Sequence, residues 1–290
     1  MSSVSSVKIN QQKRDFREIY NASEPTQYFS TMATLDYQIP ENARPCIEFL
    51  LYELKSCKRL EQLNILDIGC SYGVLSALIK YNLTLNFLYS VYTKEMFRES
   101  SNISSVKYSL MPSRSYLNFY GIDSSINAVK YAIDVGLLES GVGADLEQDG
   151  QVDLDKIPKD IDLIVSTGCF GYITDQTLMK ILDHTYGCSR PVIVSFVMRP
   201  FDYSPAIDSL ASIGYRTRQL NGQYFRQRKF FDRGEQNHIF NLVSETAMAL
   251  SGDQIPEADG YSYATLFVSE HQADRPTSLF DVFGSDPTCA

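Results

Sequence analysis

The stretch 64–79 constrains the fold of this chain most, because a buried strand, a glycine turn and a helix follow one another without a break. Its first part, 65–68, is a short apolar run typical of a parallel strand covered on both faces. Gly69 and Gly73 interrupt the pattern, and 74–79 then carries apolar residues at helical spacing. The sequence therefore predicts an α/β fold with a strand–turn–helix unit near its centre.

A glycine turn of this kind suits a ligand, because backbone N–H groups approach it closely and the positive end of a helix faces it. A dinucleotide site has the pattern G-x-G-x-x-G. Started at Gly69, that pattern requires glycine at positions 71 and 74, which hold Ser71 and Val74. A dinucleotide is therefore disfavoured, and an ordinary turn without a ligand is the remaining alternative.

The same stretch resembles motif I of the class I S-adenosylmethionine-dependent methyltransferases, whose pattern is roughly D/E-x-G-x-G-x-G. The acid and the outer glycines match, and a small serine replaces the middle glycine. The resemblance covers roughly residues 45–269. It implies S-adenosylmethionine as the cofactor, with contacts from the turn residues Asp67, Gly69, Cys70, Ser71 and Gly73.

Two acids follow at the ends of later predicted strands. The strand 117–123 ends at Asp123, and Ser124 or Ser125 can cap the helix that follows. A carboxylate there can accept hydrogen bonds from both ribose hydroxyls, and the resemblance assigns this role to Asp123. Asp145, at the end of 141–146, matches the motif that reaches the adenine edge. The predicted cofactor set also includes the neighbouring residues Ser124 and Leu146, and Ser166 at the end of the next strand.

The acceptor side of the site is predicted from position alone. The strand that begins at residue 160 leads into the loop 166–172, which should line the crevice beyond the strand ends. The motif of the amine-methylating branches is absent there, so no catalytic residue can be transferred. In the N-terminal extension, aromatic residues are dense around the stretch 21–45, which is interpreted either as a lid or as a surface segment. The predicted substrate-pocket residues are Tyr28, Tyr37, Thr167, Tyr172 and Arg199.

Charge and cysteine usage exclude several other classes. The 290 residues carry a net charge of −9, which disfavours nucleic acid and anionic membranes as partners. The segment 222–233 mixes basic and aromatic residues, but it is short, and we expect a solvated face between strands. Six scattered cysteines without a C-x-x-C pair, and three histidines, argue against a metal site. No signal peptide or membrane span is evident, so we expect a cytoplasmic protein.

The expected fold is a seven-stranded, mostly parallel sheet with helices on both faces and an antiparallel last strand, 261–268. A helix starting at Pro45 should pack beside the first strand. The expected organisation is an N-terminal extension over 1–44, a methyltransferase domain over 45–269 with an insertion at about 82–116, and a C-terminal tail over 270–290. The insertion is expected to contain one helix, and either to cap the pocket or to form a homodimer contact.

The resemblance implies methyl transfer to a small molecule, amino-acid-like or a secondary metabolite. No histidine occupies a motif-derived catalytic position, which favours an acceptor that needs no strong base, such as a thioether like methionine or a neutral amine. The catalytic residues stay unknown. Two alternatives are open: a nicotinamide-dependent oxidoreductase, and a catalytically inactive partner subunit with this fold.

Overall fold

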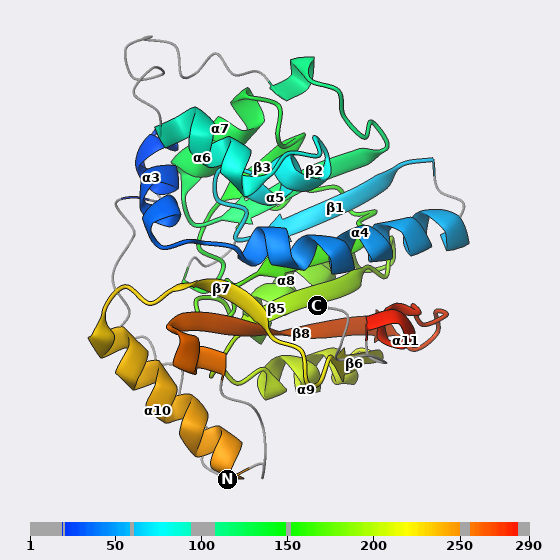
Figure 1. Ribbon diagram of the computed structural model, residues 1–290. Coiled ribbons are helices and arrows are strands. Elements are labelled where there is room, and N and C mark those ends of the chain that lie inside the picture. The colour runs from blue at the N-terminus through cyan, green and yellow to red at the C-terminus, as the bar shows by residue number, and fades with distance from the viewer. Residues whose placement is uncertain are drawn as a thin grey trace.

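A computed structural model describes residues 19, 21–58, 61–93, 108–148, 152–249 and 256–283. Within these ranges the strands form one eight-stranded sheet in the order β3-β2-β1-β4-β5-β8-β6, and β7 also pairs with β8 (Figure 1). The strands are β1 Leu63–Ile68, β2 Leu117–Asp123, β3 Ser140–Gly143, β4 Leu163–Thr167, β5 Val192–Met198, β6 Tyr215–Gln219, β7 Phe225–Lys229 and β8 Tyr261–His271.

Strand direction identifies the fold. Strands β1 to β5 pair in parallel, whereas β8 runs antiparallel to β5, β6 and β7. This order, with one reversed strand placed between the fifth and sixth, is the class I methyltransferase fold. The predicted architecture and its antiparallel last strand are confirmed, and one further strand, β7, is added to the seven that were expected.

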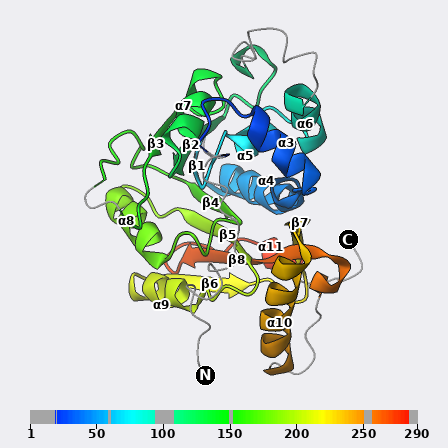
Figure 2. The same cartoon turned by 90° about the vertical axis from the view of Figure 1, so that its left-hand side faces the viewer.

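Helices cover both faces of the sheet (Figure 2). They are α3 Thr26–Thr34, α4 Ile39–Lys58, α5 Val74–Ile79, α6 Leu85–Thr93, α7 Ile126–Asp134, α8 Asp175–Thr185, α9 Ser204–Ser212, α10 Arg233–Ala249 and α11 Leu279–Phe283. The alternation along β1 shows the two layers: Leu63 and Ile65 pack with α4, α5 and α7, whereas Leu66 and Ile68 pack with α8 and α9. Both faces of the sheet are therefore buried, as the apolar run in β1 predicts.

The crevice of the sheet lies between β1 and β4. The chain leaves β1 toward β2 on one side and leaves β4 toward β5 on the other, so the strand order reverses at this pair. In open α/β sheets a ligand binds beyond the carboxyl ends of the strands at such a point. The turn after β1 and the loop after β4 meet there, because a Cβ built on Gly69 would lie 2.8 Å from the Cβ of Cys169.

The predicted helix beside the first strand starts earlier than expected. It begins at Ile39 rather than at Pro45, which lies inside it. Pro40 instead occupies the first turn, where its missing N–H is tolerated. This turn is also tied to β7, because the Asn42 Nδ2 donates to the Arg226 carbonyl at 2.8 Å. The earlier start is therefore accompanied by a tertiary contact that sequence periodicity does not report.

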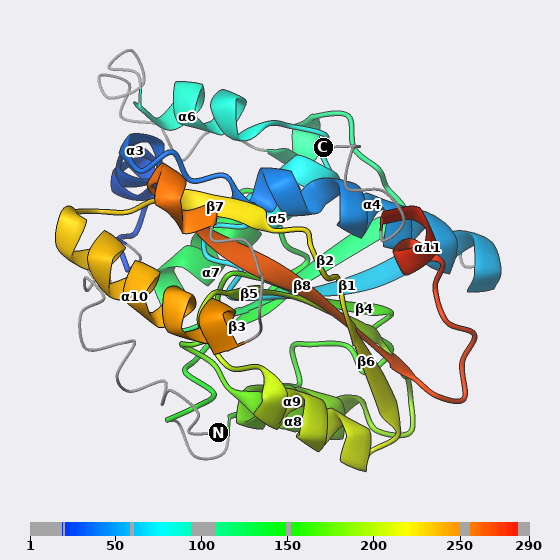
Figure 3. The same cartoon turned by 60° about the horizontal axis from the view of Figure 1, so that its bottom comes forward.

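The segment 222–233 is the main error of the sequence-based prediction, because it holds strand β7 rather than a solvated face. Strand β8 is long enough for two partners on one edge: β6 pairs with its residues 267–271 and β7 with its residues 261–264. Figure 3 shows β7 between α4 and β8. Pairing along this edge buries Gln227 and Arg228 within the basic run.

The remaining expectations fall partly outside the described residues. The insertion contains the predicted helical piece, α6, and a short 3₁₀ turn at Tyr108–Leu110. The pattern of residues 13–20 also suggests a short amphipathic helix, and this stretch lies outside the described residues apart from Ile19. Over the described ranges, no helix has the length and apolar character needed to cross a membrane.

Candidate functional site at the carboxyl ends of β1 and β4

A cavity of about 670 Å³ opens at the carboxyl ends of the central strands. This volume lies within the range of small-molecule and cofactor sites, roughly 300–1,000 Å³. One side, called here the acidic side, is formed by the ends of β1, β2 and β3 with Asp67, Asp123 and Asp145. The opposite side, called here the β7 side, is formed by α3, the start of α4, the end of β5, and β7.

The turn after β1 is shaped by three residues in the left-handed region. Gly69, Ser71 and Gly73 have φ values of 74°, 48° and 76°. The close approach of Cys169 explains why Gly69 must lack a side chain, and Gly73 sits against Leu137 in the same way, with a built Cβ 2.9 Å from its Cβ. Ser71 is the exception, since a non-glycine residue at positive φ is strained.

Asp123 compensates for that strain by holding the turn. Its Oδ2 accepts the Ser71 N–H at 2.9 Å, and its Oδ1 accepts the Ser125 N–H at 2.8 Å. Burial raises the pKa of Asp123, and these two backbone donors act in the opposite direction. Each carboxylate oxygen keeps a further lone pair, so the side chain can also accept hydrogen bonds from a molecule in the cavity.

Asp67 is a buried acid with an unfilled hydrogen-bonding position. Its side chain is 2 % exposed, and its Oδ1 makes no hydrogen bond within the described part of the chain. Burial, together with the nearby Asp123, raises the pKa of Asp67 well above its ordinary value. Since buried polar atoms are nearly always paired, this oxygen indicates a ligand that brings a donor or a positive charge.

The third acid, Asp145, lies in the turn after β3. Its Oδ1 accepts the Glu147 N–H at 3.0 Å. Glu147 in turn accepts hydrogen bonds from the hydroxyls of Thr174, at 2.7 Å, and Thr177, at 2.5 Å. These contacts fasten the turn to the start of α8, so that the edge of the cavity has a fixed shape.

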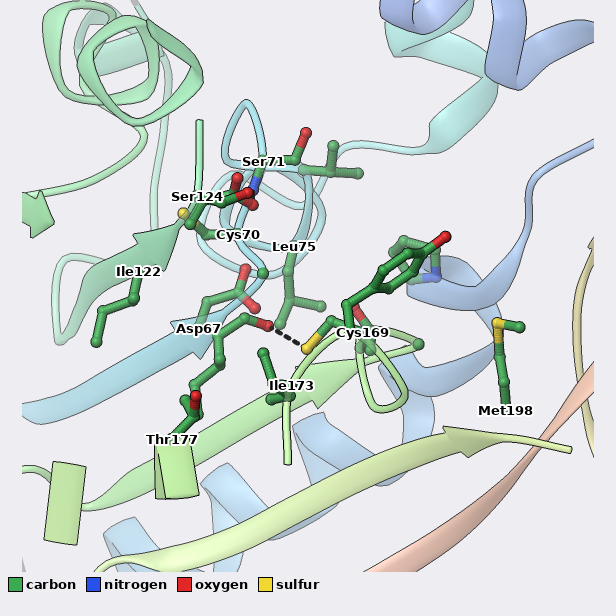
Figure 4. Close-up of a pocket in the computed structure, with 18 of the residues that line it drawn as sticks. Asp67, Cys70, Ser71, Leu75, Ile122, Ser124, Cys169, Ile173, Thr177 and Met198 are labelled. Carbon is green, nitrogen blue, oxygen red and sulfur yellow. Dashed lines mark hydrogen bonds between the residues drawn. The ribbon is translucent and has the colours of Figure 1, made fainter. Parts of the chain in front are cut away.

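Most of the predicted cofactor residues meet at this cavity. Those that line it are Asp67, Gly69, Cys70, Ser71, Asp123, Ser124, Asp145 and Leu146. Two lie behind the lining: Gly73 precedes the first turn of α5, and the Ser166 hydroxyl is 2.9 Å from the Cys169 Sγ. In the view of Figure 4, Cys169 lies between the group of Asp67, Ser71 and Ser124 and the side chain of Met198.

Four of the five predicted pocket residues also line the cavity, namely Tyr28, Tyr37, Thr167 and Tyr172. Arg199 does not. Its Nε lies 3.4 Å from the Glu257 Oε1, and its guanidinium stacks over the Tyr224 ring at 4.1 Å. The arginine follows β5 as expected, but the buried Glu257 holds it outside the lining.

Several lining residues were missed by the sequence reasoning. Met198 ends β5, so the strand-end rule could have found it, and Met32 lies one helical turn after Tyr28 in α3. Nothing local marks Gln227 or Arg228 as internal. The other lining residues not predicted individually are Pro40, Ile68, Val74, Leu75, Ile122, Ala144, Gln148, Gly168, Cys169, Ile173 and Thr177.

The two cysteines in the lining are not poised as nucleophiles. Burial raises the pKa of Cys169 to about 12, and burial also raises the pKa of Cys70. Both thiols therefore stay protonated near neutral pH, where a reactive cysteine needs a lowered pKa. Among the described residues, no group of His, Cys, Asp and Glu side chains is placed to hold a metal ion.

No protein-family model and no curated protein matches the sequence. Solved structures similar to this chain include the magnesium protoporphyrin IX methyltransferase of Synechocystis, with 12% identity, a TM-score of 0.39, and coverage of 93% of this chain and 99% of the other. A TehB-like methyltransferase of Corynebacterium glutamicum shows 16% identity and a TM-score of 0.39, with coverage of 83% and 94%. A methyltransferase of Geobacter sulfurreducens shows 11% identity and a TM-score of 0.32, with coverage of 94% and 100%. For this chain the fold assignment rests on the strand order and registers of its own sheet.

Proposed function

We propose that this protein transfers a methyl group from S-adenosylmethionine to a small-molecule acceptor. The observation that carries the proposal is the pair Asp67 and Asp123 around the turn 69–73, at the crevice of the sheet. Asp67 offers an unpaired buried oxygen, and Asp123 offers acceptor positions beyond those that hold the turn. A ligand with a cationic group and a diol satisfies both, as S-adenosylmethionine does.

The acidic side supplies the remaining contacts of the proposed cofactor site. The backbone of the turn 69–73 would face the methionine portion, and Asp67 would accept a hydrogen bond from its ammonium group. Asp123 would bind the ribose hydroxyls, and Asp145 with the Leu146 N–H would bind the adenine edge. A bound cation would lower the raised pKa of Asp67, so cofactor binding and ionisation of this acid support one another.

The bound cofactor supplies an activated methyl group on a sulfonium. The protein then aligns the acceptor for an in-line displacement and excludes water. Among the described residues that line the cavity there is no His, Lys or Glu. This lining favours an acceptor whose attacking atom already carries a lone pair at neutral pH, such as a thioether or a neutral amine, because no strong base is needed.

The N-terminal segment 21–44 would cover the acceptor. Tyr28, Met32 and Tyr37 contribute to the lining, and the Tyr72 hydroxyl in the turn after β1 donates to the Ala22 carbonyl at 2.9 Å. A lid that starts at the cofactor turn and ends beside β7 would close both sides of the cavity together.

Calorimetric titration with S-adenosylhomocysteine tests the proposal. The wild type should bind it, and Asp123→Ala should weaken binding about 10- to 100-fold, since hydrogen bonds to a charged group contribute roughly 1.5–3 kcal/mol. Asp134→Ala, an exposed acid on α7, is the matched control and should bind normally. Absence of binding to the wild type would contradict the proposal.

The oxidoreductase alternative is tested in the same experiment. Asp123 could also bind the ribose of a dinucleotide, although Ser71 and Val74 depart from the dinucleotide pattern. NADH that binds while S-adenosylhomocysteine does not would favour this alternative. A screen with tritiated S-adenosylmethionine over thioethers, amines, thiols, hydroxyls and carboxylates separates an active enzyme from an inactive partner subunit.

A further inference from the structure

A β-bulge in β7 directs a glutamine into the cavity. Strand β7 pairs with β8 through Phe225 and Arg226 and again through Arg228 and Lys229, with a shift of register between Arg226 and Arg228. Gln227 is the extra residue at this shift. As a result Gln227 and Arg228, which follow one another, are both buried, at 6 % and 7 % exposed. Bulges re-aim side chains in this way and are frequent next to active sites.

The Gln227 side chain has one hydrogen-bonded end and one open end. The Ser262 hydroxyl shares its single proton between the Gln227 Oε1, at 3.1 Å, and the Arg228 carbonyl oxygen, at 3.2 Å. Its Nε2 lies beside Gly168, a lining residue, and a Cβ built on that glycine would come within 2.8 Å of it. In the described part of the chain this NH₂ group makes no hydrogen bond, although the whole residue is more than nine-tenths buried. This donor opens into the cavity without a partner among the described residues, so it is available to an acceptor atom on a ligand.

The protein groups around Gln227 disfavour an anionic ligand. Arg228 is the adjacent cation, but its guanidinium forms two hydrogen bonds with Glu235, at 2.7 and 3.0 Å, so its charge is balanced. The other charged side chains in the lining are the aspartates of the acidic side. An anionic ligand would therefore find no protein cation among the described lining residues that is not already paired with a carboxylate. The rest of the β7 side is aromatic or apolar, with Tyr28, Met32 and Met198.

We propose that Gln227 selects the methyl acceptor by donating a hydrogen bond to a carbonyl oxygen of an uncharged, largely apolar molecule. This inference rests on the proposed function, since it names the substrate class for the same cavity. The carbonyl would be the recognition group of the acceptor, separate from the atom that receives the methyl group. Ser262 acts as a positioning residue, because its hydroxyl contacts the end of the amide that lies away from the cavity.

The test uses matched pairs of probes that differ only at the carbonyl. Binding of 4-(methylthio)acetophenone is compared with that of 4-ethylthioanisole, and binding of methyl benzoate with that of benzyl methyl ether. Each is titrated by ligand-observed NMR against the protein saturated with S-adenosylhomocysteine, and against the protein alone. The wild type should bind the carbonyl member about tenfold more tightly, because its counterpart leaves the amide donor unpaired.

Variants then assign the preference to Gln227. Gln227→Met keeps the volume and removes the donor, so the carbonyl preference should disappear while S-adenosylhomocysteine still binds. Gln227→Glu replaces the donor by an acceptor and should also abolish the preference. Ser262→Ala should reduce it, because the amide is no longer oriented. Gln219→Met, at an exposed glutamine on β6, should keep the wild-type preference.

The outcomes separate this inference from the proposed function. If S-adenosylhomocysteine binds but neither pair shows a carbonyl preference, or Gln227→Met and Gln227→Glu both keep it, the inference is overturned alone. Tighter binding of 4-(methylthio)aniline, which presents N–H groups at the same place, would mean that the amide faces the other way and would also overturn it. If the cofactor product does not bind but the preference persists, the proposed function fails while Gln227 keeps its assignment as a carbonyl-binding residue.

Discussion

The acidic side and the β7 side of the cavity are constructed differently. On the acidic side, each contact comes from the end of a parallel strand and the turn directly after it, as with Asp67 and Gly69 after β1 or Asp123 after β2. On the β7 side, Tyr28, Met198 and Gln227 come from a helix near the N-terminus, the end of β5 and a strand far along the chain. One side is a set of local motifs, and the other is an assembly of distant segments.

This difference has a functional consequence. The acidic side is shaped by backbone conformation, with positive φ angles and N–H groups bonded to a carboxylate, and it suits one kind of ligand. The β7 side is shaped by side chains that a single substitution can exchange without moving a strand. Under the proposed function, the cofactor binds the acidic side and the acceptor binds the β7 side, so the acceptor can change while the cofactor site is kept.

Glu235→Gln should give the largest loss of stability, and this loss should arise on the β7 side and leave the acidic side intact. It removes the partner of the buried Arg228, and loss of one member of a buried ion pair costs about 3–5 kcal/mol. We expect a clear loss of stability in urea unfolding, with binding of S-adenosylhomocysteine retained by the folded protein. Asp274→Asn breaks the exposed pair with Arg190 as a control and should change the stability far less, because exposed ion pairs are screened by solvent. Equal effects of the two substitutions would show that β7 does not depend on the buried pair.

Gly69→Ala should disturb the contact between the turn after β1 and the loop after β4, where the two sides of the cavity meet. The new Cβ would lie 2.8 Å from the Cys169 Cβ, at a φ of 74°. Strain and overpacking together should cost about 2–4 kcal/mol in the free energy of unfolding. Gly187→Ala is the matched control, because its φ is 78° but nothing lies within 4 Å of a built Cβ. The difference between the two variants measures the close approach itself, and equal losses would mean that backbone strain alone is responsible.

Asp67→Asn should change the acidic side in two opposite ways. It should raise the stability of the free protein at pH 7 and weaken the binding of S-adenosylhomocysteine. Burial raises the pKa of Asp67, so the folded protein holds this proton more tightly than the unfolded chain does. The stability that this bound proton contributes is therefore lost as the pH rises from the ordinary pKa of 3.8 toward the raised pKa of the folded protein. The variant should be more stable than the wild type at pH 7, by on the order of 1 kcal/mol, and equally stable below that ordinary value.

The measurement is thermal unfolding of both proteins across pH, without ligand and with S-adenosylhomocysteine. S-adenosylhomocysteine should stabilise the wild type more than the variant. The uncharged amide of the variant cannot form an ion pair with the ammonium group of the ligand. A stability difference that does not change with pH would contradict the assignment of the effect to this acid.

Tyr72→Phe should give the smallest effect, and it tests whether the two sides are coupled through the N-terminal segment. The hydroxyl donates to the Ala22 carbonyl at 2.9 Å, and one such hydrogen bond contributes about 0.5–1.5 kcal/mol. We expect faster amide hydrogen exchange in α3 with little change in the sheet. Tyr52→Phe, at an exposed tyrosine on α4, should leave exchange unchanged. If amide exchange in α3 is unchanged in Tyr72→Phe, the order of the N-terminal segment does not depend on its hydrogen bond to the turn after β1.

The sequence predicted an element well where the residues that indicate it are the same residues that form it. The strand 117–123 and the cap of the next helix follow from alternation and from Ser125, whose hydroxyl accepts the Ala128 N–H at 3.2 Å. The placement of Arg199 shows the limit of such reasoning. Its position after a strand was correct, but its side chain is taken by Glu257, a residue far along the chain whose role no local pattern reveals.

The sequence by itself determined the fold class and the acidic side. Strand-end acids and turn glycines act within a few residues of their own strand, and the parallel sheet brings all strand ends to one edge. Only the tertiary structure decided the β7 side. Whether a basic, aromatic run is solvated or paired depends on the free edge of β8, and the bulge that turns Gln227 inward exists only once that pairing has formed. Hydrogen bonding between distant strands is not encoded in local periodicity, which is why the residues of the acidic side were identifiable and those of β7 were not.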